Sequence, residues 1–376
     1  MPNSSILFLR SNPIDPDPRV EKEARALVEA GYTVAVLGWD RTAALPSREE
    51  KNGFVIHRLG IKAEFGRGLA NFPALLRWQV SLFWWLLRHQ RQVDVIHSCD
   101  FDTILPALVL KWLAKKRVVY DIFDFYADHL RATPALIKRF IRRVDLFAVD
   151  KADAVILPDE SRQAQIASAN PRSVTYIYNS PEEPADLPAL PRTSSFLFNI
   201  TYVGLLQVER GLLTLLEVLE KHPQWGLRLA GFGGDQEMIL QKASSLPNVT
   251  FHGRVPYNQA ISLSQMADVL IATYDPSIPN HRFSSPNKIF EAMMLSKPIV
   301  VARHTNMDDI VARADCGIVV EYGSVTELEI ALSQLAENVE LRHRLGANGR
   351  KAYLSTYRWE IMAKRLLSLY SSLSGA

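Results

Sequence analysis

Short apolar runs alternate with longer amphipathic segments along almost the whole chain. The apolar runs have the length and composition of strands buried on both faces, and the longer segments repeat their apolar positions at helical spacing. This alternation predicts an α/β architecture with parallel sheets. In the first half, the pattern predicts strands at 6–9, 33–37, 55–59, 93–97, 117–121, 153–158 and 174–178, and helices at 19–30, 72–90, 103–114, 134–151 and 160–169.

A proline-rich segment interrupts this pattern. Residues 180–192 contain four prolines and almost no periodicity, which is typical of an extended linker. The alternation then resumes, with strands predicted at 199–203, 227–231, 248–253, 268–274, 298–302 and 317–321 and helices at 212–221, 235–245, 258–267, 287–295 and 307–314. We therefore expect an N-terminal domain at 1–180, a linker at 181–196, a second domain at 197–356 and a closing helix at 357–376. Two such domains form a cleft between the carboxyl ends of their sheets, where open parallel sheets bind ligands.

Two glycine-containing loops follow predicted strands of the second domain. In the first, GLLQVERG, Gly204 and Gly211 let the backbone approach a ligand, and Arg210 stands at the start of a helix, a place that favours anions. The second, AGFGGD, is so rich in glycine that it indicates a group lying close to the backbone. Its candidate residues are Gly231 and Gly233. Tight turns alone are the alternative interpretation of both loops.

The segment SPNKIFEAM at 285–293 combines a helix start with two charged side chains. Pro286 suits the first turn of a helix. Lys288 lies where a cation opposes the helix dipole, which a shared phosphate would explain, and Glu291 is on the same helical face. An ordinary Lys–Glu surface pair is the alternative. The candidate binding residues of this segment are Ser285, Pro286, Asn287, Lys288 and Glu291.

From Tyr202 onwards, the order of these motifs resembles glycosyltransferase family 4, with GLLxxxRG, AGFG, FxGxV, SPNKIFEAM, KPIVVA and GIVV. The resemblance implies a GT-B fold, in which two Rossmann-like domains face a cleft and a C-terminal helix, here anchored by Trp359, crosses back to the first domain. It also implies retention of anomeric configuration with no required metal and no cofactor. In this family the residue matching Arg210 contacts the donor diphosphate, and the one matching Glu291 holds the ribose hydroxyls. Lys288 is assigned to the phosphates.

The N-terminal half resembles the same family more loosely, in a branch of capsular and cell-surface polysaccharide enzymes. Where relatives often have a D-x-H-E pattern, this chain has Asp121-Ile122-Phe123-Asp124, so the histidine is lost. We expect Asp121 and Asp124 at the carboxyl end of a strand, acting on the acceptor side, while Arg210 and Lys288 act on the donor. Helix capping is the alternative role for Asp121.

The resemblance predicts a glycosyltransferase that uses a UDP- or GDP-linked sugar as donor. The acceptor is expected to be a glycan or lipid-linked molecule in cell-surface polysaccharide or glycolipid synthesis. Two departures stand in the donor half: Phe283 replaces a glutamate that many members have, and Leu205 replaces an arginine. Alternative functions are a UDP-sugar epimerase of the same fold and a non-catalytic nucleotide-sugar-binding subunit.

The distribution of charged and aromatic residues predicts that the protein also binds an anionic membrane surface. The 376 residues carry a net charge of only +3, but residues 1–180 hold 25 basic and 20 acidic side chains. Residues 65–92 mix tryptophan with arginine, and residues 134–147 place basic beside apolar side chains, which suits an anionic headgroup boundary. The basic residues of the second segment are Lys138, Arg139, Arg142 and Arg143. This modest excess does not indicate nucleic-acid binding.

Other sequence features indicate where in the cell the protein is expected and argue against a metal site. The longest apolar runs fall short of the roughly 20 residues that span a bilayer, and we see no signal peptide. Cys99 and Cys316 lie far apart and outside any metal-ligand spacing. A cytoplasmic protein, peripheral on the inner face of the membrane, is therefore expected.

Overall fold

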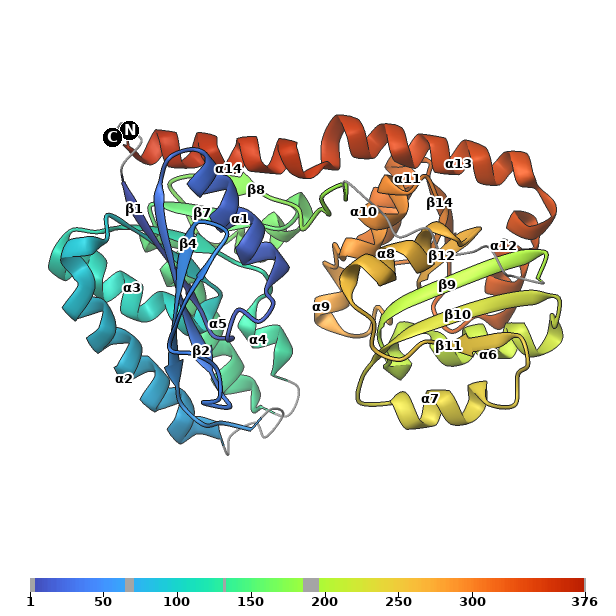
Figure 1. Cartoon of the computed structure of the whole chain (residues 1–376), viewed down its shortest axis with the longest axis horizontal. Coiled ribbons are helices and arrows are strands. Elements are labelled where there is room, and N and C mark those ends of the chain that lie inside the picture. Colours follow the sequence, from blue (N-terminus) through green and yellow to red (C-terminus); the bar gives the residue numbers. More distant parts are fainter. Residues whose placement is uncertain (1–3, 65–70, 131–132, 185–195, 375–376) are drawn as a thin grey trace. The chain divides into compact units, whose positions relative to one another are not determined.

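The chain forms two compact α/β units. We describe a computed structural model, and the description covers residues 4–64, 71–130, 133–184 and 196–374. Residues 1–178 and 362–376 make up the N-terminal unit, and residues 179–361 make up the C-terminal unit. The closing helix α14 (Trp359–Ser374) therefore contributes most of its length to the N-terminal unit (Figure 1). Most of the predicted linker, residues 185–195, lies outside the described residues.

The N-terminal unit contains an eight-stranded sheet in the order β3-β4-β2-β1-β5-β6-β7-β8. The strands are β1 (Ser5–Arg10), β2 (Thr33–Asp40), β3 (Arg48–Lys51), β4 (Phe54–Gly60), β5 (Val95–Cys99), β6 (Arg117–Asp121), β7 (Ala154–Leu157) and β8 (Val174–Tyr176). All described pairings are parallel except β3–β4. The apolar pattern missed β3 because this edge strand, REEK, buries no side chain fully. The turn Asn52-Gly53, with both residues at positive φ, was the available hairpin signal.

Helices cover both faces of this sheet. They are α1 (Pro18–Glu29), α2 (Phe72–His89), α3 (Phe101–Ala114), the short α4 (Tyr126–His129) and α5 (Ala135–Lys151). Figure 1 shows α2 and α3 on one side of the sheet and α1 on the other. Asp17 begins α1 as an N-cap, since its side chain accepts a hydrogen bond from the Val20 amide. The helix expected at 160–169 is a 3-10 helix over Glu160–Ile166.

The C-terminal unit contains a six-stranded sheet in the order β11-β10-β9-β12-β13-β14, parallel in every described pairing. Its strands are β9 (Phe198–Leu205), β10 (Trp225–Phe232), β11 (Val249–Phe251), β12 (Val269–Ala272), β13 (Ile299–Ala302) and β14 (Gly317–Val320). Its helices are α6 (Leu212–Lys221), α7 (Gln236–Ala243), α8 (Tyr257–Gln265), α9 (Pro279–Arg282), α10 (Asn287–Met294), α11 (Met307–Ala314), α12 (Val325–Glu337) and α13 (Val339–Ala352). The predicted class of two parallel-sheet α/β domains is confirmed.

Candidate functional site

The loops after β9, β10 and β12 come together at the carboxyl edge of the second sheet, because these three strands are neighbours. The loop after β9 carries Arg210, and the loop after β12 carries Tyr274. The start of α10 reaches the same edge, since the Lys288 ammonium lies against Gly204 at the end of β9. The structure therefore brings together the donor-side residues that the sequence placed in separate motifs.

Arg210 is held in place and presents an unsatisfied N–H group. Its guanidinium stacks on the Tyr274 ring, 3.9 Å from the ring centre, and its carbonyl accepts a hydrogen bond from Thr273 Oγ1 at 3.3 Å. Gly211 follows at φ 72°, where a Cβ would collide with Thr273. The buried Nε of Arg210 finds no acceptor among the described residues. A fixed guanidinium with a spare donor is well suited to bind an anionic oxygen.

Lys288 occupies a similar place on the neighbouring ring. Its Nζ lies 4.7 Å from the centre of the Tyr202 ring, and a Cβ on Gly204 would lie only 2.2 Å from it. Burial and the nearby Tyr274 raise the pKa of Tyr202 well above its usual value, and Arg210 partly opposes this shift. The two rings are thus close in space, and each carries one of the two cations.

The first turn of α10 adds backbone donors. Pro286 is the N-cap residue and provides no side-chain cap, so the amides of the first turn, which starts at Asn287, have no such partner in the described chain. The buried Ser285 hydroxyl likewise has no hydrogen-bond partner within the described ranges. Uncapped amides, a hydroxyl and Lys288 together form a positive site at a helix N-terminus.

Glu291 lies one turn further along α10 and contacts α8. Burial and the Glu291 carboxylate, which accepts a hydrogen bond from the phenol, raise the pKa of Tyr257. Tyr257 is itself half exposed. The sequence offered a Lys288–Glu291 surface pair as the alternative, but the Lys288 ammonium lies over Tyr202.

The glycine-rich loop after β10 is explained by the chain's own packing. A Cβ on Gly231 would lie 1.8 Å from the Gly204 carbonyl oxygen, and a Cβ on Gly233 would lie 2.4 Å from the Leu206 carbonyl oxygen. The group that lies close to this backbone is therefore the neighbouring strand and loop. Contact of Gly231 and Gly233 with a ligand stays a prediction.

A third cation of this region was missed by the sequence reasoning. Arg254 follows β11, and its guanidinium lies 4.7 Å from the ring centre of Phe232, the last residue of β10. Both side chains are exposed. The signal was the arginine directly after FHG, at the carboxyl end of a predicted strand.

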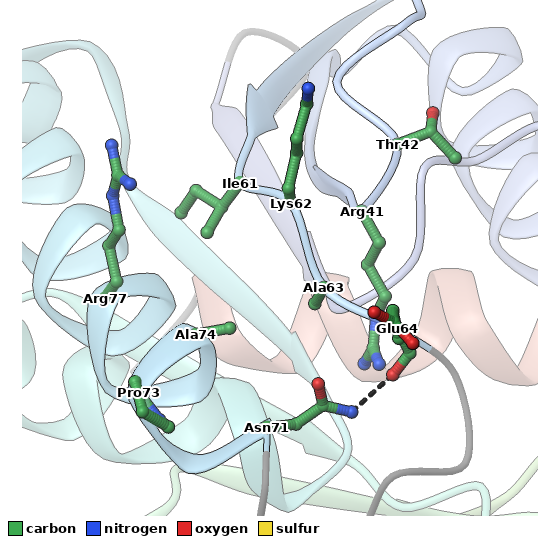
Figure 2. A pocket seen from close by; sticks show the side chains of 10 residues that line it. All are labelled: Arg41, Thr42, Ile61, Lys62, Ala63, Glu64, Asn71, Pro73, Ala74 and Arg77. Carbon is green, nitrogen blue, oxygen red and sulfur yellow. Dashed lines mark hydrogen bonds between the residues drawn. The ribbon is translucent and has the colours of Figure 1, made fainter.

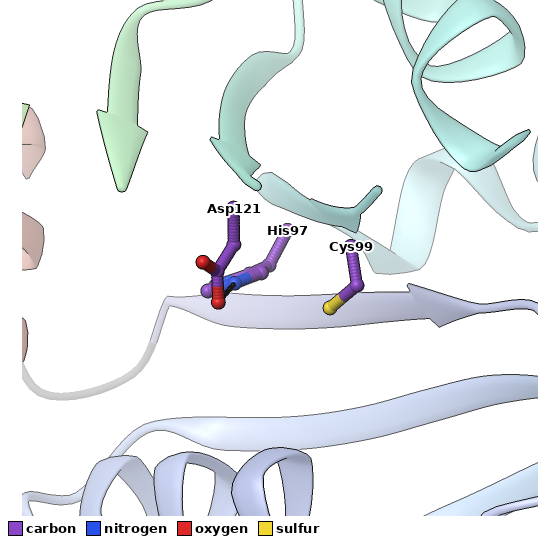
Figure 3. Close-up of side chains that lie close together, drawn as sticks. All are labelled: His97, Cys99 and Asp121. Atoms are coloured by element: carbon purple, nitrogen blue, oxygen red, sulfur yellow. Dashed lines mark hydrogen bonds and ion pairs between the residues drawn. The ribbon is translucent and has the colours of Figure 1, made fainter. Parts of the chain in front are cut away.

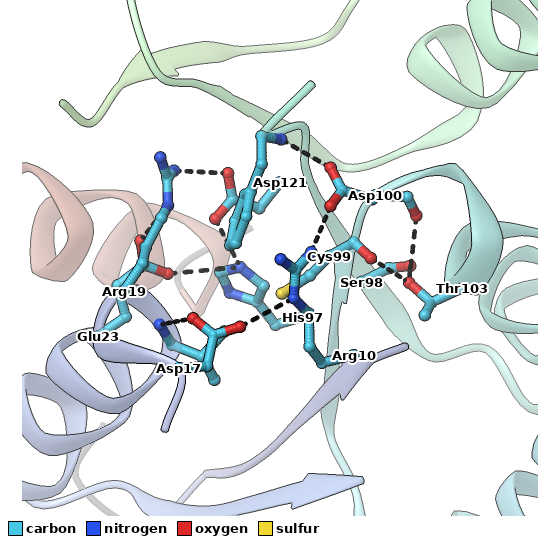
Figure 4. Close-up of polar contacts among 12 residues, drawn as sticks. Arg10, Asp17, Arg19, Glu23, His97, Ser98, Cys99, Asp100, Thr103 and Asp121 are labelled. Atoms are coloured by element: carbon cyan, nitrogen blue, oxygen red, sulfur yellow. Dashed lines mark hydrogen bonds and ion pairs between the residues drawn. The ribbon is translucent and has the colours of Figure 1, made fainter. Parts of the chain in front are cut away.

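In the N-terminal unit, Asp121 belongs to a buried polar network (Figure 4). It ends β6 and is fully buried, with Oδ1 2.8 Å from Arg19 Nη2 and Oδ2 3.4 Å from His97 Nε2. Arg19 also pairs with Glu23 at 3.1 Å. His97 Nδ1 lies 2.7 Å from the Tyr370 hydroxyl of α14. The network therefore joins strands β5 and β6 and helix α1 to the C-terminal helix α14.

Phe123 stands where the resemblance implies a histidine, and its ring holds two cations. The guanidiniums of Arg10 and Arg19 each lie 4.2 Å from its ring centre. Arg10 also pairs with Asp17 and Asp100, and the Asp100 carboxylate accepts a hydrogen bond from the Phe123 amide. Sequence reasoning did not single out either arginine. Arg10 ends β1 and Arg19 lies in the first turn of α1, so both lie at the carboxyl edge of the sheet.

The two predicted acceptor-side aspartates differ in exposure. Asp121 has no exposed surface, so it does not reach a ligand directly, and it caps no described helix, since Phe125 is the N-cap of α4. Asp124 is 41% exposed and pairs with Arg162 at 2.6 Å. Asp124 alone of the pair is placed to touch a bound molecule, and Asp121 positions Arg19 and His97.

His97, Cys99 and Asp121 lie close enough to be considered as metal ligands (Figure 3). One ligand atom from each lies within 4.8 Å of the others. Burial, assisted by Asp121, raises the pKa of the Cys99 thiol well above its usual value, so the sulfur holds its proton. Asp121 already engages Arg19 and His97. A protonated thiol beside a guanidinium does not suit a cation, and the residues fit a hydrogen-bonded network better.

Glu23 makes the stability of this network depend on pH. Burial and the neighbouring Asp121 raise the pKa of Glu23 to about 8, so folding favours its protonated form. Its contribution to stability is complete below the unfolded pKa near 4.5 and is lost as the pH rises through about 8. Glu23→Gln cannot lose this proton, so its unfolding free energy relative to wild type should rise by about 2–4 kcal/mol between pH 5 and pH 8.5.

Urea unfolding at several pH values measures this difference. Glu29→Gln, on the exposed end of the same helix, is the matched control and should show no such change. A constant difference between Glu23→Gln and wild type across this range would contradict the assignment.

The segments predicted to contact a membrane are partly exposed and partly core. On α2, Trp78 is buried against Trp39, whereas exposed apolar side chains recur every fourth residue. These are Phe72, Leu76, Val80 and Trp84. Residues 65–70 of this segment lie outside the described residues. No described helix has both the length and the hydropathy needed to cross a bilayer.

On α5, the expected separation of basic and apolar sides holds only in part. Leu136 and Phe140 are 77% and 67% exposed. Arg142 turns inward instead, since its guanidinium lies 4.2 Å from the Phe125 ring centre and donates to the Gln165 carbonyl. The prediction that Arg142 faces outward was wrong, because a buried ring and carbonyl offer it better partners than solvent does.

Both halves of the chain match models of known families. Residues 197–352 match the model described as "Glycosyl transferases group 1", and residues 16–180 match "Glycosyl transferase 4-like domain". The capsular polysaccharide biosynthesis glycosyltransferase CapM of Staphylococcus aureus is 25% identical over 183 residues, which are 46% of this chain and 46% of CapM. The match thus spans about half the length of the curated relative.

Solved structures show the same fold over nearly the whole chain. Sucrose-phosphate synthase from Thermosynechococcus elongatus superposes with a TM-score of 0.81 at 17% identity, covering 99% of each chain. HepE from Anabaena, solved in complex with UDP-glucose, gives a TM-score of 0.70 at 16% identity, covering 98% of this chain and 99% of HepE.

Proposed function

The chain belongs to the glycosyltransferases with the GT-B fold, of the family 4 type, and from this premise we propose that it transfers a sugar from a nucleotide-sugar donor to a cell-surface glycan or lipid-linked acceptor. The pairing of Arg210 and Lys288 over adjacent tyrosine rings carries this proposal. UDP-sugars are the first donors to test, because HepE was solved with UDP-glucose. GDP-sugars are the comparison.

The proposed mechanism stabilises the departing diphosphate. As the bond from the anomeric carbon to the phosphate oxygen breaks, negative charge builds on the diphosphate, and Arg210, Lys288 and the amides at the start of α10 neutralise it. The acceptor hydroxyl forms the new bond on the same face of the sugar and gives its proton to the leaving phosphate oxygen, so configuration is retained. These two cations perform the neutralisation that a metal ion supplies elsewhere, which supports metal independence.

Incubation with a radiolabelled donor tests the activity. With UDP-glucose or a GDP-sugar and water as the default acceptor, slow release of nucleoside diphosphate is expected, undiminished by EDTA. Recovery of intact donor would support a non-catalytic binding subunit, and an epimerised nucleotide sugar would support the epimerase alternative. Product configuration by NMR tests retention.

Glu291→Gln tests the nucleoside end of the donor site. A neutral amide binds ribose hydroxyls less strongly than a carboxylate does, so the donor Kd should rise about fivefold to tenfold. Calorimetric titration with UDP measures this change. Tyr257→Phe removes only the hydrogen bond to Glu291 and should leave most of the affinity intact. An unchanged Kd for Glu291→Gln would remove Glu291 from the site.

We also propose that the N-terminal unit attaches peripherally to anionic membranes. The exposed apolar residues of α2 and α5 supply the inserted surface, and Lys138, Arg139 and Arg143 supply the charge. Each cation contributes about 1 kcal/mol near anionic lipid, so changing all three to glutamine should weaken binding about 100-fold. Flotation with vesicles of increasing phosphatidylglycerol content measures it.

A matched triple variant controls for net charge. Changing Arg303, Arg344 and Lys351, which are exposed on the C-terminal unit, removes the same charge and should leave flotation unchanged. Binding that ignores the anionic lipid content would refute the attachment.

A further inference from the structure

His281 lies beside the cations of the donor site, although the function proposed above gives it no role. It belongs to the short helix α9 and is only 5% exposed. Its ring centre lies 5.3 Å from that of Tyr274, the ring on which the Arg210 guanidinium stacks. His281 and Arg210 therefore contact the same supporting ring.

Backbone hydrogen bonds hold His281 in this place. The Asp275 amide donates to the Glu209 carbonyl at 2.9 Å, which joins the loop after β12 to the loop that carries Arg210. The His281 amide donates to the Ile278 carbonyl at 2.9 Å and closes the turn at the start of α9. The position of His281 beside Arg210 is therefore set by the backbone of both loops.

The two ring nitrogens of His281 differ in their partners. Nδ1 lies 2.9 Å from the Asp275 carbonyl oxygen. A carbonyl only accepts, so Nδ1 carries the hydrogen, and Nε2 of the neutral ring is an acceptor directed away from that carbonyl. Within the described part of the chain, Nε2 has no hydrogen-bond partner. A buried side chain with such an acceptor indicates a ligand that donates a hydrogen bond to it.

The charged groups around the ring keep His281 neutral. Burial and the nearby Arg210 charge lower the pKa of His281, while the Asp275 carbonyl and the carboxylates of Glu209 and Asp275 oppose this shift. Neutral Nε2 cannot donate to a phosphate oxygen, which only accepts. A hydroxyl of a nucleotide sugar can donate to Nε2, so a hydroxyl is the better partner.

The order of the donor-side residues selects the hydroxyl of the transferred sugar. A nucleotide sugar carries its diphosphate between the ribose and the sugar. Glu291, which is proposed to bind ribose, lies one turn after Lys288 on α10. His281 lies beside Arg210 instead. With the diphosphate held by the two cations, the Lys288 side meets the ribose and the Arg210 side meets the sugar.

We propose that His281 Nε2 accepts a hydrogen bond from a hydroxyl of the donor sugar and thereby favours the nucleotide sugar over the nucleotide alone. This assignment rests on the proposed function, because it describes the sugar end of the same donor site. His281 then acts as a specificity-determining residue. A donor that lacks the matching hydroxyl leaves the buried acceptor without a partner and binds less tightly.

Calorimetric titration with UDP and UDP-glucose tests the assignment. His281→Asn keeps an amide that can donate to the Asp275 carbonyl but removes Nε2. Its Kd for UDP-glucose should rise about fivefold to tenfold, while its Kd for UDP should stay unchanged. His281→Gln supplies an amide oxygen near the position of Nε2 and should recover part of the loss. Equal losses for both ligands would make His281 a support for Arg210, and no loss would remove it from the site; either result overturns the assignment.

UDP-glucose analogues that lack a single hydroxyl identify the bound group. For one of the 2-, 3-, 4- and 6-deoxy analogues, wild type and His281→Asn should bind with equal Kd, because each change removes the same hydrogen bond. Losses that add for all four analogues would overturn the assignment.

The pH dependence distinguishes a sugar contact from a phosphate contact. Protonation occupies the Nε2 lone pair, so the preference of wild type for UDP-glucose over UDP should decline as the pH falls below 6.5. His281→Gln measured at the same pH corrects for protonation of the nucleotides themselves, and its preference should decline less. UDP binding that tightens at low pH in wild type alone would place a phosphate oxygen at His281 and overturn the sugar assignment.

Asn71→Ala is a matched control in the N-terminal unit. Asn71 lines the hollow drawn in Figure 2, and its side chain donates to the Glu64 carbonyl. This variant also loses a hydrogen bond from a side chain to a carbonyl, in a unit that contains none of the donor residues, and should change neither Kd. Wild-type protein that binds no UDP- or GDP-linked sugar would refute the proposed function. A preference for UDP-glucose over UDP that survives His281→Asn would refute the sugar assignment alone.

Discussion

Replacing Arg210 or Lys288 by alanine is expected to lower kcat roughly 10²–10³-fold, which corresponds to about 3–4 kcal/mol of transition-state stabilisation. Both cations lie over buried tyrosine rings at the carboxyl edge of the second sheet, where the departing diphosphate is proposed to lie. Cations that are already held in position stabilise the negative charge of the transition state most effectively. Both side chains are held in position by stacking on the tyrosine rings. The loss should therefore appear in kcat at saturating donor.

Stability measurements separate a catalytic loss from a folding defect. Each variant removes a half-exposed cation and its contact with a tyrosine ring, which should change the unfolding free energy by about 1 kcal/mol. Lys221→Ala, which breaks an exposed ion pair with Glu329, is a matched control and should retain full turnover. Near-native turnover of either Arg210→Ala or Lys288→Ala would show that the diphosphate is bound elsewhere.

Asp121→Asn should destabilise the N-terminal unit by about 3–5 kcal/mol, because it leaves the buried Arg19 guanidinium with a weaker partner. Although burial acts to raise it, the Arg19 charge and His97 hold the pKa of Asp121 below its usual value, so the residue is an anion in the folded protein. Transfer should fall as the network loosens. The donor Kd should stay unchanged, since the donor residues belong to the other unit.

Comparison with Asp124→Asn distinguishes a structural role from direct contact with the acceptor. Asp124 is 41% exposed and its partner Arg162 is buried, so weakening this pair should cost about 1–2 kcal/mol, less than the loss of the fully buried Asp121 pair. We expect this variant to remain folded and to lose transfer through a higher KM for acceptor. Equal destabilisation of both variants would show that Asp124 also supports the fold, and a raised donor Kd would move it to the nucleotide site.

The local alternation of apolar runs and amphipathic helices was enough to determine the architecture. A strand buried on both faces must be apolar throughout, and a covering helix must repeat its apolar face, so both leave direct traces in the sequence. The edge strand β3 has no apolar pattern, because its four residues are charged and none is fully buried. Only the Asn52-Gly53 turn marks it. The donor site proposed here was suggested by a similar local signal, since Lys288 lies where a cation opposes the helix dipole and Arg210 lies between two glycines at the start of a helix.

Tertiary structure alone decided what surrounds those residues. The tyrosines that support the two cations are separated by 72 positions, and no local pattern links Tyr202 to Tyr274. The glycine-rich loop predicts a group close to the backbone at Gly231 and Gly233, and in the fold the carbonyls of Gly204 and Leu206 lie there. The periodicity of a sequence does not show which distant segments pack together, because the order of strands in the sheet decides which residues are in contact.

The same limit applies to charge. The sequence shows that Asp121 ends a strand and that residues 138–143 are basic, but burial decides what each charge does. Asp121 is buried between Arg19 and His97 and holds both in position, whereas Asp124, three residues later, remains accessible to solvent. Arg142 turns onto Phe125 while Arg139 and Arg143 stay exposed. A charged side chain takes the partner that best offsets its loss of hydration, and only the folded chain shows which partner is within reach.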